Sequence, residues 1–214
     1  MLQCILAHDS NYGVGFDDHL PDWTHTPDSK LDMKLFVDKT KNKTLIVGRK
    51  TYESLPSKLL KTRNRDFLIF SKKNFYETHR TVTNLFDLNN ELKYTPKEKI
   101  VIGGRLIYNI LIDYVTTAYV TVFNKEYTCN AFLTPKVMSF LENENIHTSI
   151  TNGEATFKEY RRLFKCPYCS GNLTITTAGT MFTAFCPHCI FSLDHENYFN
   201  LIDTLKRKCK ILAN

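Results

Sequence analysis

The stretch LDMKLFVDKTKNKTLIVGRKTYESLP, residues 31–56, decides how this chain folds. Residues 31–40 place apolar side chains three and four positions apart, which predicts a helix. Asp32 and Phe36 share one face of that helix, since they lie four residues apart. A carboxylate that faces a protein core costs free energy unless a partner binds it. The sequence therefore predicts that Asp32 has such a partner.

The same stretch continues into a strand, a glycine and a second helix. Residues 43–48, KTLIVG, are an apolar run that predicts a buried strand, and residues 49–55, RKTYESL, predict a helix. The arrangement returns at residues 99–111, KIVIGGRLIYNIL, with two glycines at the junction. Glycine lets a ligand approach the backbone closely, and the free N–H groups of a helix N-terminus can bind phosphate.

The basic residues after the first glycine indicate the kind of ligand. Arg49 and Lys50 add two full positive charges to the helix N-terminus. Neither junction has the G-x-G-x-x-G pattern, so the usual dinucleotide-binding fold is excluded. Two such junctions in one domain favour a phosphorylated cofactor, and the extra charge favours an additional phosphate, such as the 2′-phosphate of NADP.

Length and composition limit the class of protein. The 214 residues suffice for one domain and a small module, and 43% hydrophobic with 23% charged residues is an ordinary globular composition. A net charge of +6 suits an anionic small molecule or a weak attraction to nucleic acid. No apolar run approaches the roughly 20 residues that span a bilayer, and residues 1–15 lack the features of a signal peptide. We therefore expect a cytoplasmic protein with no membrane partner.

Strand-like and helix-like segments alternate through the first three-quarters of the chain, which predicts an α/β fold. Further strands are expected at residues 2–9, 65–71, 118–124 and 155–164. The character of the sequence changes close to Cys166, where paired cysteines begin. We therefore expect one domain at residues 1–164 and a smaller one at residues 165–214.

Four of the seven cysteines lie in two pairs within the smaller domain, CPYC at 166–169 and CPHC at 186–189. Four thiolates with this spacing can close tetrahedrally around zinc, and the 16 residues between the pairs suit a β-hairpin. The predicted ligands are Cys166, Cys169, Cys186 and Cys189. With four sulfur ligands and no open position, the zinc is expected to be structural, and the segment resembles a zinc ribbon.

A basic helix is expected at the end of the chain, in NYFNLIDTLKRKCKIL at 197–212. Leu201, Leu205, Cys209 and Leu212 fall on one stripe of that helix, so part of it must be buried against another segment. The sequence leaves two possibilities for the ribbon. It packs against the rest of the chain or mediates assembly, or it contacts nucleic acid or another protein through aromatic and basic residues.

Four stretches of the larger domain resemble the dihydrofolate reductase family, in the family's order. They are ILAHDSNYGVGFDDHLPDW at 5–23, the stretch quoted above at 31–56, VIGGRLIY at 101–108 and AYVTVFN at 118–124. The resemblance implies a mixed, mostly parallel central sheet flanked by helices. It also implies NADPH-dependent reduction of dihydrofolate, with a hydride transferred to C6 and a proton delivered to N5.

The resemblance also assigns roles around the substrate. Asp32 falls at the family's active-site acid, which binds the 2-amino group and N3 of the pterin ring, and Thr121 matches the threonine that supports that acid. Ile5, Met33 and Phe36 would line the folate pocket, and Arg65 would bind the α-carboxylate of the glutamate tail. Two alternatives stay open: Asp28, one helical turn earlier, could be the acid, and Arg63 could replace Arg65.

On the cofactor side, the implied contacts follow the two glycine junctions. Ala7 would meet the nicotinamide carboxamide through its backbone, and Val14 and Gly15 belong to the loop over the nicotinamide. The remaining expected contacts are Gly48, Arg49, Lys50 and Thr51 for the phosphates, Ser71 and Lys72 near the adenosine, and Gly103, Gly104, Arg105, Leu106, Ile107 and Tyr108 along the pyrophosphate and nicotinamide.

The chain departs from the family around its tryptophan. The usual Leu-Pro-Trp is here LPDW, with Asp22 inserted before Trp23, and the segments before Asp32 and Arg65 are longer than in compact members. A second hypothesis retains the reductase fold as a structural or interaction module whose zinc ribbon contacts nucleic acid or a protein assembly. An inactivated copy would be expected to lose Asp32 or Arg49, and their presence favours an enzyme.

Overall fold

The computed structural model describes residues 1–61, 64–72, 79–94 and 97–209. Its centre is an eight-stranded sheet with the strand order β5-β4-β3-β6-β1-β7-β10-β9. The strands from β5 to β7 are parallel, and the last two are antiparallel to their neighbours. The strands are β1 (Leu2–Asp9), β3 (Thr44–Gly48), β4 (Asp66–Phe70), β5 (Arg80–Val82), β6 (Lys99–Gly103), β7 (Val115–Phe123), β9 (Asn145–Asn152) and β10 (Ala155–Arg161).

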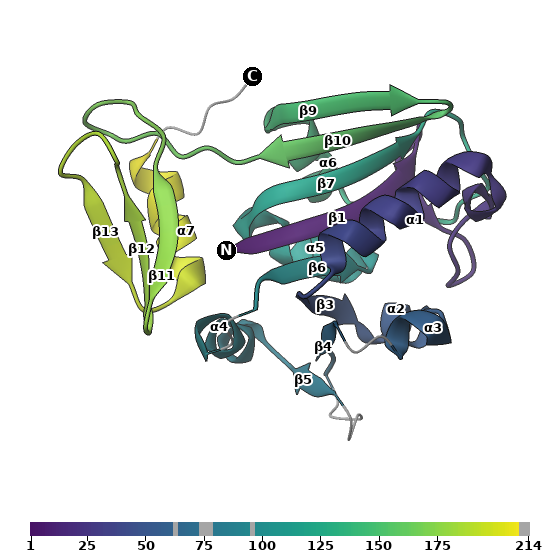
Figure 1. Ribbon diagram of the computed structural model, residues 1–214, viewed down its shortest axis with the longest axis horizontal. Coiled ribbons are helices and arrows are strands. Elements are labelled where there is room, and N and C mark those ends of the chain that lie inside the picture. Colours follow the sequence, from purple (N-terminus) through teal and green to yellow (C-terminus); the bar gives the residue numbers. More distant parts are fainter. Residues whose placement is uncertain (62–63, 73–78, 95–96, 210–214) are drawn as a thin grey trace.

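Helices cover both faces of this sheet (Figure 1). One face carries α1 (Pro27–Thr40), and α5 (Arg105–Leu111) and α6 (Pro135–Asn143) lie behind the sheet in the same view. The remaining elements of this part are α2 (Arg49–Ser54), α3 (Ser57–Leu60), α4 (Leu85–Tyr94), the short 3-10 helices at Asp22–His25 and Ile112–Tyr114, and the two-stranded pair of β2 (Gly13–Gly15) with β8 (Ala131–Phe132). The predicted mixed, mostly parallel α/β sheet is confirmed.

The two faces of the sheet divide the hydrophobic core. In β3, Ile46 packs into one buried cluster while its neighbours Leu45 and Val47 pack into another. In β6, Val101 lies between Ile100 and Ile102 in the same way. Successive side chains of a strand point to opposite faces, so an uninterrupted apolar run is what a strand covered on both sides requires.

The C-terminal part forms a small module beside the sheet. Its three antiparallel strands are β11 (Thr174–Ala178), β12 (Met181–Phe185) and β13 (Ser192–His195), and α7 (Tyr198–Lys208) follows them. The expected hairpin between the cysteine pairs is β11–β12, and β13 is an addition that the sequence analysis did not foresee. In Figure 1 the module lies next to the N-terminus of β1.

The apolar stripe of the last helix is buried, as its spacing predicted. Leu201 and Leu205 have no exposed surface, and Cys209 is 5% exposed. Leu212, the fourth member of the stripe, lies outside the described residues. No helix among the described residues has both the length and the hydrophobicity needed to cross a membrane.

Candidate active site and metal site

The predicted site residues gather at the carboxyl ends of the parallel strands. Gly48 at the end of β3 pairs with Phe70 at the end of β4, so the chain leaves both strands, at Arg49 and Ser71, on the same end of the sheet. Val47 pairs with Gly103 of β6, which brings the two glycine junctions next to each other. In open α/β sheets, ligands bind in the crevice outside the carboxyl ends of the strands.

Asp32 has a partner in the chain, as the sequence predicted. The hydroxyl of Thr121, a fully buried side chain on β7, donates a hydrogen bond of 2.5 Å to Oδ1 of Asp32. Within the described part of the chain, Oδ2 of Asp32 accepts no hydrogen bond. Burial raises the pKa of the Asp32 carboxyl, and the Thr121 hydrogen bond opposes part of that rise. A partly buried carboxylate therefore offers one oxygen to a ligand.

Asp28, the alternative acid, serves a different purpose. Its Oδ2 accepts a hydrogen bond of 2.9 Å from the backbone N–H of Glu154, in the turn between β9 and β10. Gly153 in that turn has a φ of +58°, and a Cβ there would lie 2.6 Å from Oδ1 of Asp28. Asp28 thus ties the start of α1 to a turn, whereas Asp32 is held by Thr121 of the central sheet.

Apolar side chains are exposed on both segments that adjoin the acid. On α1, Met33 and Val37 are 48% and 44% exposed, and Phe16 and Leu20 in the preceding loop are 41% and 62% exposed. Ile5 is buried, and Phe36 packs against the same cluster as Ile5. Exposed apolar groups beside a partly buried acid are typical of a pocket for a flat, largely apolar ligand.

Arg65 lies at the end of α1 and is almost fully buried. Its Nε donates to the Thr40 hydroxyl at 2.9 Å, and another guanidinium nitrogen donates to the Val37 carbonyl at 3.0 Å. Burial lowers the pKa of this guanidinium. The geometry gives Arg65 a role in holding the C-terminal end of α1, and the competing Arg63 lies outside the described residues.

The two glycine junctions are packed against each other. A Cβ on Gly48 would lie 2.9 Å from Cγ1 of Ile107, and a Cβ on Gly104 would lie 2.5 Å from the Thr51 hydroxyl. Gly103 has a φ of +123°, a conformation that side chains oppose, and the peptide bond after it is cis. Neither Gly48 nor Gly104 can carry a side chain without displacing the opposite junction, so the glycines let the two junctions pack closely.

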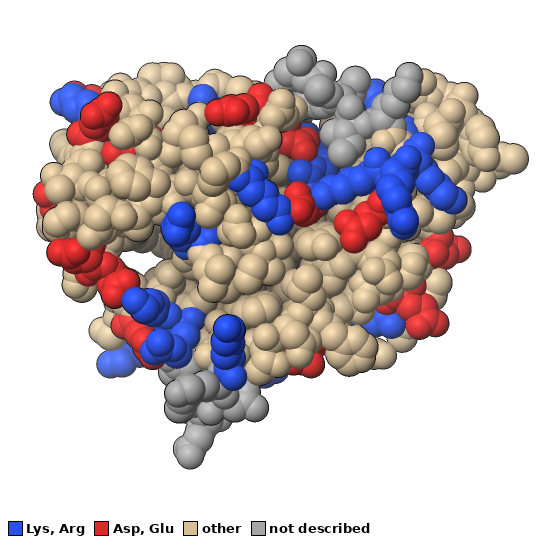
Figure 2. Space-filling model, turned by 180° about the vertical axis from the view of Figure 1, so that it is seen from behind, with Lys and Arg blue, Asp and Glu red and all other residues tan. Residues whose placement is uncertain are grey.

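Cationic side chains surround these junctions. Arg49, Lys50, Lys72 and Arg105 are all exposed, and Figure 2 shows one gathering of Lys and Arg at the lower edge of the molecule. Arg49 bonds both carboxylate oxygens of Glu53, at 3.0 and 3.1 Å. Lys50 forms an ion pair of 3.1 Å with Asp18, which belongs to the loop after β2.

The remaining predicted cofactor residues take different positions. Tyr108 is buried, and its hydroxyl donates to the Ile5 carbonyl at 2.7 Å. Ala7 lies beside Thr121 in the sheet, and Val14 and Gly15 form part of β2. Arg105 donates from Nε to the Phe132 carbonyl at 2.7 Å. Leu106 is 66% exposed, whereas Ser71 is buried and donates its backbone N–H to Val82.

The sequence analysis missed Asp9, which organises the turn between β1 and β2. This buried carboxylate accepts backbone hydrogen bonds from Asn11, Gly13 and Tyr127, at 2.7 to 2.9 Å. The signal was present, because an aspartate followed by Ser-Asn at a strand end is typical of a side chain that caps a turn. Asp9 thereby joins the end of β1 to two loops.

Trp23 follows the inserted Asp22. It is 2% exposed and stacks on Phe123 of β7, with ring centroids 4.9 Å apart. Tyr127 contacts its edge at 5.6 Å. The inserted Asp22 and Trp23 both lie in a 3-10 helix. Trp23 is thereby buried against Phe123, which ends β7 two residues beyond Thr121.

A family model described as dihydrofolate reductase matches residues 1–162. The chain belongs to the dihydrofolate reductase family. A dihydrofolate reductase of Staphylococcus aureus (strain MSSA476) is 28% identical over 134 residues, which cover 63% of this chain and 78% of that protein. Membership in the family supports an oxidoreductase that acts on dihydrofolate.

Two further comparisons concern a solved structure and a relative with a different name. The solved dihydrofolate reductase of Enterococcus faecalis, complexed with NADP(H) and RAB-propyl, has the same fold, with a TM-score of 0.63 at 20% identity over 75% of this chain and 95% of that one. A Mycoplasma pneumoniae protein named segregation and condensation protein A is 28% identical over 153 residues. That match covers 69% of this chain but 28% of that protein, so the chain spans about a quarter of it.

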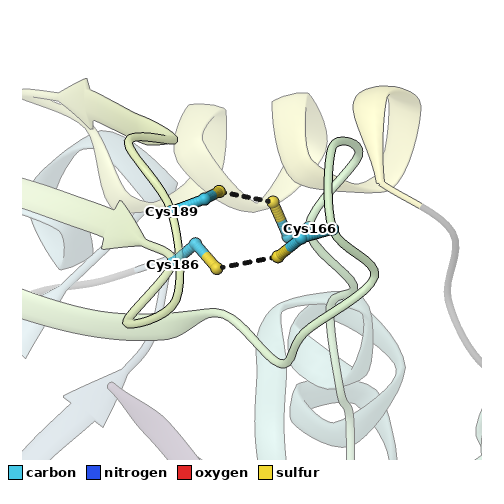
Figure 3. A group of neighbouring side chains, drawn as sticks. Cys166, Cys186 and Cys189 are labelled. Atoms are coloured by element: carbon cyan, nitrogen blue, oxygen red, sulfur yellow. Dashed lines mark hydrogen bonds between the residues drawn. The ribbon is translucent and has the colours of Figure 1, made fainter.

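The four paired cysteines follow the part that matches dihydrofolate reductase. Figure 3 shows the sulfur atoms of Cys166, Cys186 and Cys189 directed at one another from the two loops. The sulfurs of Cys166 and Cys189 are 3.5 Å apart, those of Cys169 and Cys186 are 3.4 Å apart, and all four lie within 4.8 Å of one another. Four such thiols could hold a metal ion.

Proposed function

We propose that this chain reduces 7,8-dihydrofolate to tetrahydrofolate with NADPH, by hydride transfer to C6 and protonation at N5. The observation that carries the proposal is the Asp32 carboxylate. One of its oxygens is held by Thr121, and the other has no partner among the described residues. Its partner Thr121 lies beside Ala7 near the carboxyl ends of β7 and β1, and the two glycine junctions end β3 and β6 at the same end of the sheet. This placement supports an acid that binds a flat, hydrogen-bonding ring.

In this proposal Asp32 and Thr121 orient the pterin ring and take part in its protonation. The Asp32 carboxylate would bind the 2-amino group and N3, and burial, which raises the pKa of Asp32, favours the protonated form that a proton transfer needs. Ile5, Met33 and Phe36 would line the pocket. Arg65 would meet the glutamate tail, because a planar guanidinium can bind a carboxylate through two parallel hydrogen bonds.

The cofactor would lie along the packed glycine junctions. Gly48 and Gly104 let the two junctions pack against each other, since a Cβ at either position would clash with the opposite junction. The phosphates and the adenosine part would be bound by Arg49, Lys50, Thr51, Ser71 and Lys72. The pyrophosphate and nicotinamide would lie along Gly103, Gly104, Arg105, Leu106, Ile107 and Tyr108. The nicotinamide ring would lie next to Ala7, Val14 and Gly15. When bound, NADPH supplies the hydride, and the protein orients both rings and excludes water.

We further propose that the four cysteines bind one structural zinc ion. A tetrahedral site with Zn–S bonds of about 2.3 Å places sulfurs about 3.8 Å apart, which the sulfur spacing fits. A closed four-sulfur site has no position for a substrate. Such thiols persist in a reducing compartment, which supports a cytoplasmic location. The proposed domain boundary lies between residues 164 and 165.

A second candidate function concerns the surface of the ribbon. Tyr168 and Ile190, in the two cysteine loops, are 76% and 98% exposed. These side chains would suit contact with nucleic acid or another protein. A chain that binds a partner but shows no NADPH oxidation would favour this function over catalysis.

The direct experiment is an assay of NADPH oxidation with dihydrofolate on the purified full chain. We expect turnover that depends on both substrates and is lost in Asp32→Asn. The matched control is Asp28→Asn, which changes a carboxylate of the same helix that is committed to the β9–β10 turn. Equal loss in both variants, or no turnover in the unaltered chain, would contradict the proposal.

A further inference from the structure

We propose that metal binding at the four cysteines holds α7 against the amino ends of the central sheet, so that the metal ion stabilises the whole reductase fold. The inference rests on the metal site proposed above and is independent of the substrate. It extends that proposal, because a structural zinc in a separate module would stabilise only the module. Three features of the described residues carry it.

The first feature is the side chain of Tyr198, which joins the two parts. It is 1% exposed, and its hydroxyl accepts from the backbone N–H of Leu2 at 3.2 Å and donates to the Tyr114 carbonyl at 2.9 Å. Its own backbone N–H donates at 2.8 Å to the side chain of Asn89 on α4, which is also buried. One tyrosine of the module therefore contacts three segments of the reductase part.

The second feature is a hydrophobic core that runs without interruption through both parts. One buried cluster includes Leu2, Leu88 and Val115 of the reductase part together with α7 and the ribbon strands. Phe199 packs on Tyr114 with ring centroids 4.6 Å apart, and Phe182 of β12 contacts Tyr198 at 5.5 Å. Helix α7 therefore lies between the ribbon sheet and the amino ends of β1 and β7. Loss of the module would expose this apolar surface of the reductase part.

The third feature is the short, buried connection to the metal site. Arg162, directly after β10, forms a buried ion pair of 2.6 Å with Glu144 and lies over the ring of Phe140. Two residues later Phe164 is 2% exposed, and Cys166 follows after two more. At the other end, the buried Cys209 ends α7 and belongs to the same core. The module that holds the cysteine site is thus anchored to the reductase part at its beginning and at the end of α7.

The metal site completes this arrangement because it closes the two cysteine loops. The two cysteine loops meet at their four sulfurs, and a metal ion bound by all four would join the loops through bonds that its removal breaks. The hairpin β11–β12 would then no longer hold Phe182 against Tyr198. Binding of metal to the folded chain alone stabilises everything whose folding depends on that contact.

The chain offers a probe at the opposite end. Trp23 is the single tryptophan, and it stacks on Phe123 at the carboxyl end of β7, whereas the module covers the amino end of that strand. The ends of a nine-residue strand are separated by roughly 26 Å, too far for a direct effect of the metal. Fluorescence of Trp23 therefore reports unfolding of the reductase part.

The experiment compares thermal unfolding of the zinc-loaded full chain with that of the same chain after a strong zinc chelator. Zinc content is measured by elemental analysis. At free zinc a thousand times its Kd, linkage predicts that removal lowers the Trp23 midpoint by on the order of 10 °C. An unchanged midpoint after complete loss of zinc would overturn the proposal. A chain that binds no zinc would overturn it as well, and turnover of dihydrofolate does not enter either outcome.

Variants provide a second measurement. Cys169→Ser/Cys189→Ser should match the chelated chain, while Ile190→Ser, beside the second cysteine loop, should match the zinc-loaded chain. Coupling is reciprocal, so Tyr198→Phe should weaken zinc binding several-fold, measured by competition with a chromogenic chelator. Unaltered zinc affinity in Tyr198→Phe would overturn the proposed coupling. If the double cysteine variant is insoluble, the comparison of zinc-loaded and chelated wild-type chain decides.

Discussion

The two ends of the parallel sheet use the same strands for opposite purposes. At the carboxyl end, Asp32 has an oxygen without a partner among the described residues, two glycine junctions meet, and Met33 and Leu20 are exposed. At the amino end, Tyr198 and the core around it are almost completely buried, and the hydroxyl of Tyr198 makes two hydrogen bonds. One end keeps groups available for ligands, and the other contributes stability.

The difference has a thermodynamic reason. A site that binds ligands carries polar groups, exposed apolar side chains and unusual backbone conformations, all of which cost stability in the absence of the ligand. The dihydrofolate reductase part accepts these costs at the carboxyl end. The module compensates at the amino end by burying apolar surface of the same strands.

The largest effect that would test this division is loss of activity at the carboxyl end. Asp32→Asn keeps an oxygen that can accept from Thr121 but removes the titratable proton. We expect kcat/KM for dihydrofolate to fall about 10²- to 10⁴-fold, with the Kd for NADPH almost unchanged. Steady-state kinetics and fluorescence titration measure the two quantities. Near-normal turnover would remove the basis for assigning catalysis to this end.

A change at the amino end should act on stability instead. Tyr198→Phe keeps the ring and removes the hydroxyl, which leaves the N–H of Leu2 and the carbonyl of Tyr114 without this partner. We expect the free energy of unfolding to fall by about 1–3 kcal/mol and kcat to stay the same. Tyr168→Phe is the control, since Tyr168 is exposed. Urea titration distinguishes the two variants, and equal stability would contradict the comparison.

The carboxyl end should also discriminate between cofactors. Arg49 is paired with Glu53, so its removal alone would leave a carboxylate close to the expected phosphate. The double variant Arg49→Gln/Glu53→Gln is therefore compared with Glu53→Gln. We expect the first to bind NADPH roughly tenfold more weakly than the second, with little difference for NADH. A similar loss for both cofactors would exclude a contact between Arg49 and the 2′-phosphate.

The burial of Asp32 should appear in the pH dependence of the free energy of unfolding. Burial raises the pKa of Asp32 above that of an unfolded aspartate, so this group favours folding when protonated. That contribution is present below the ordinary aspartate pKa and is lost as the pH rises through the raised value. Asp32→Asn should therefore be more stable than the parent at neutral pH, and the difference should shrink toward about pH 4. Urea unfolding across this range checks the sign.

The smallest effect is expected from the ion pairs at the rim of the module. Lys206 of α7 pairs with Asp113 at 3.4 Å, and Lys136 pairs with the same carboxylate at 2.7 Å. Because Asp113 keeps its second partner, Lys206→Met should change the free energy of unfolding by less than about 1 kcal/mol. A larger loss in urea titration would mean that charge, rather than apolar burial, attaches the module.

Elements that sequence reasoning missed share a physical cause. β9 is the edge strand, and those of its side chains that are described are exposed on both faces, so it has none of the apolar alternation that identifies a strand. α4 mixes Leu88 and Leu92 with asparagines and charges, and asparagine has a low helix propensity. The covered strands β1, β3 and β6 were found at once, because burial on both faces demands continuous apolar residues.

The sequence by itself determined the strand–glycine–helix junctions, the four-cysteine spacing and the need of Asp32 for a partner. These features depend on residues a few positions apart, whose geometry follows from the helix and strand periods. Only the tertiary structure decided that the partner is Thr121, 89 positions away, that Asp28 binds a turn, and that Tyr198 joins the last helix to the first strand. Such contacts depend on how distant segments pack, and no local period encodes them.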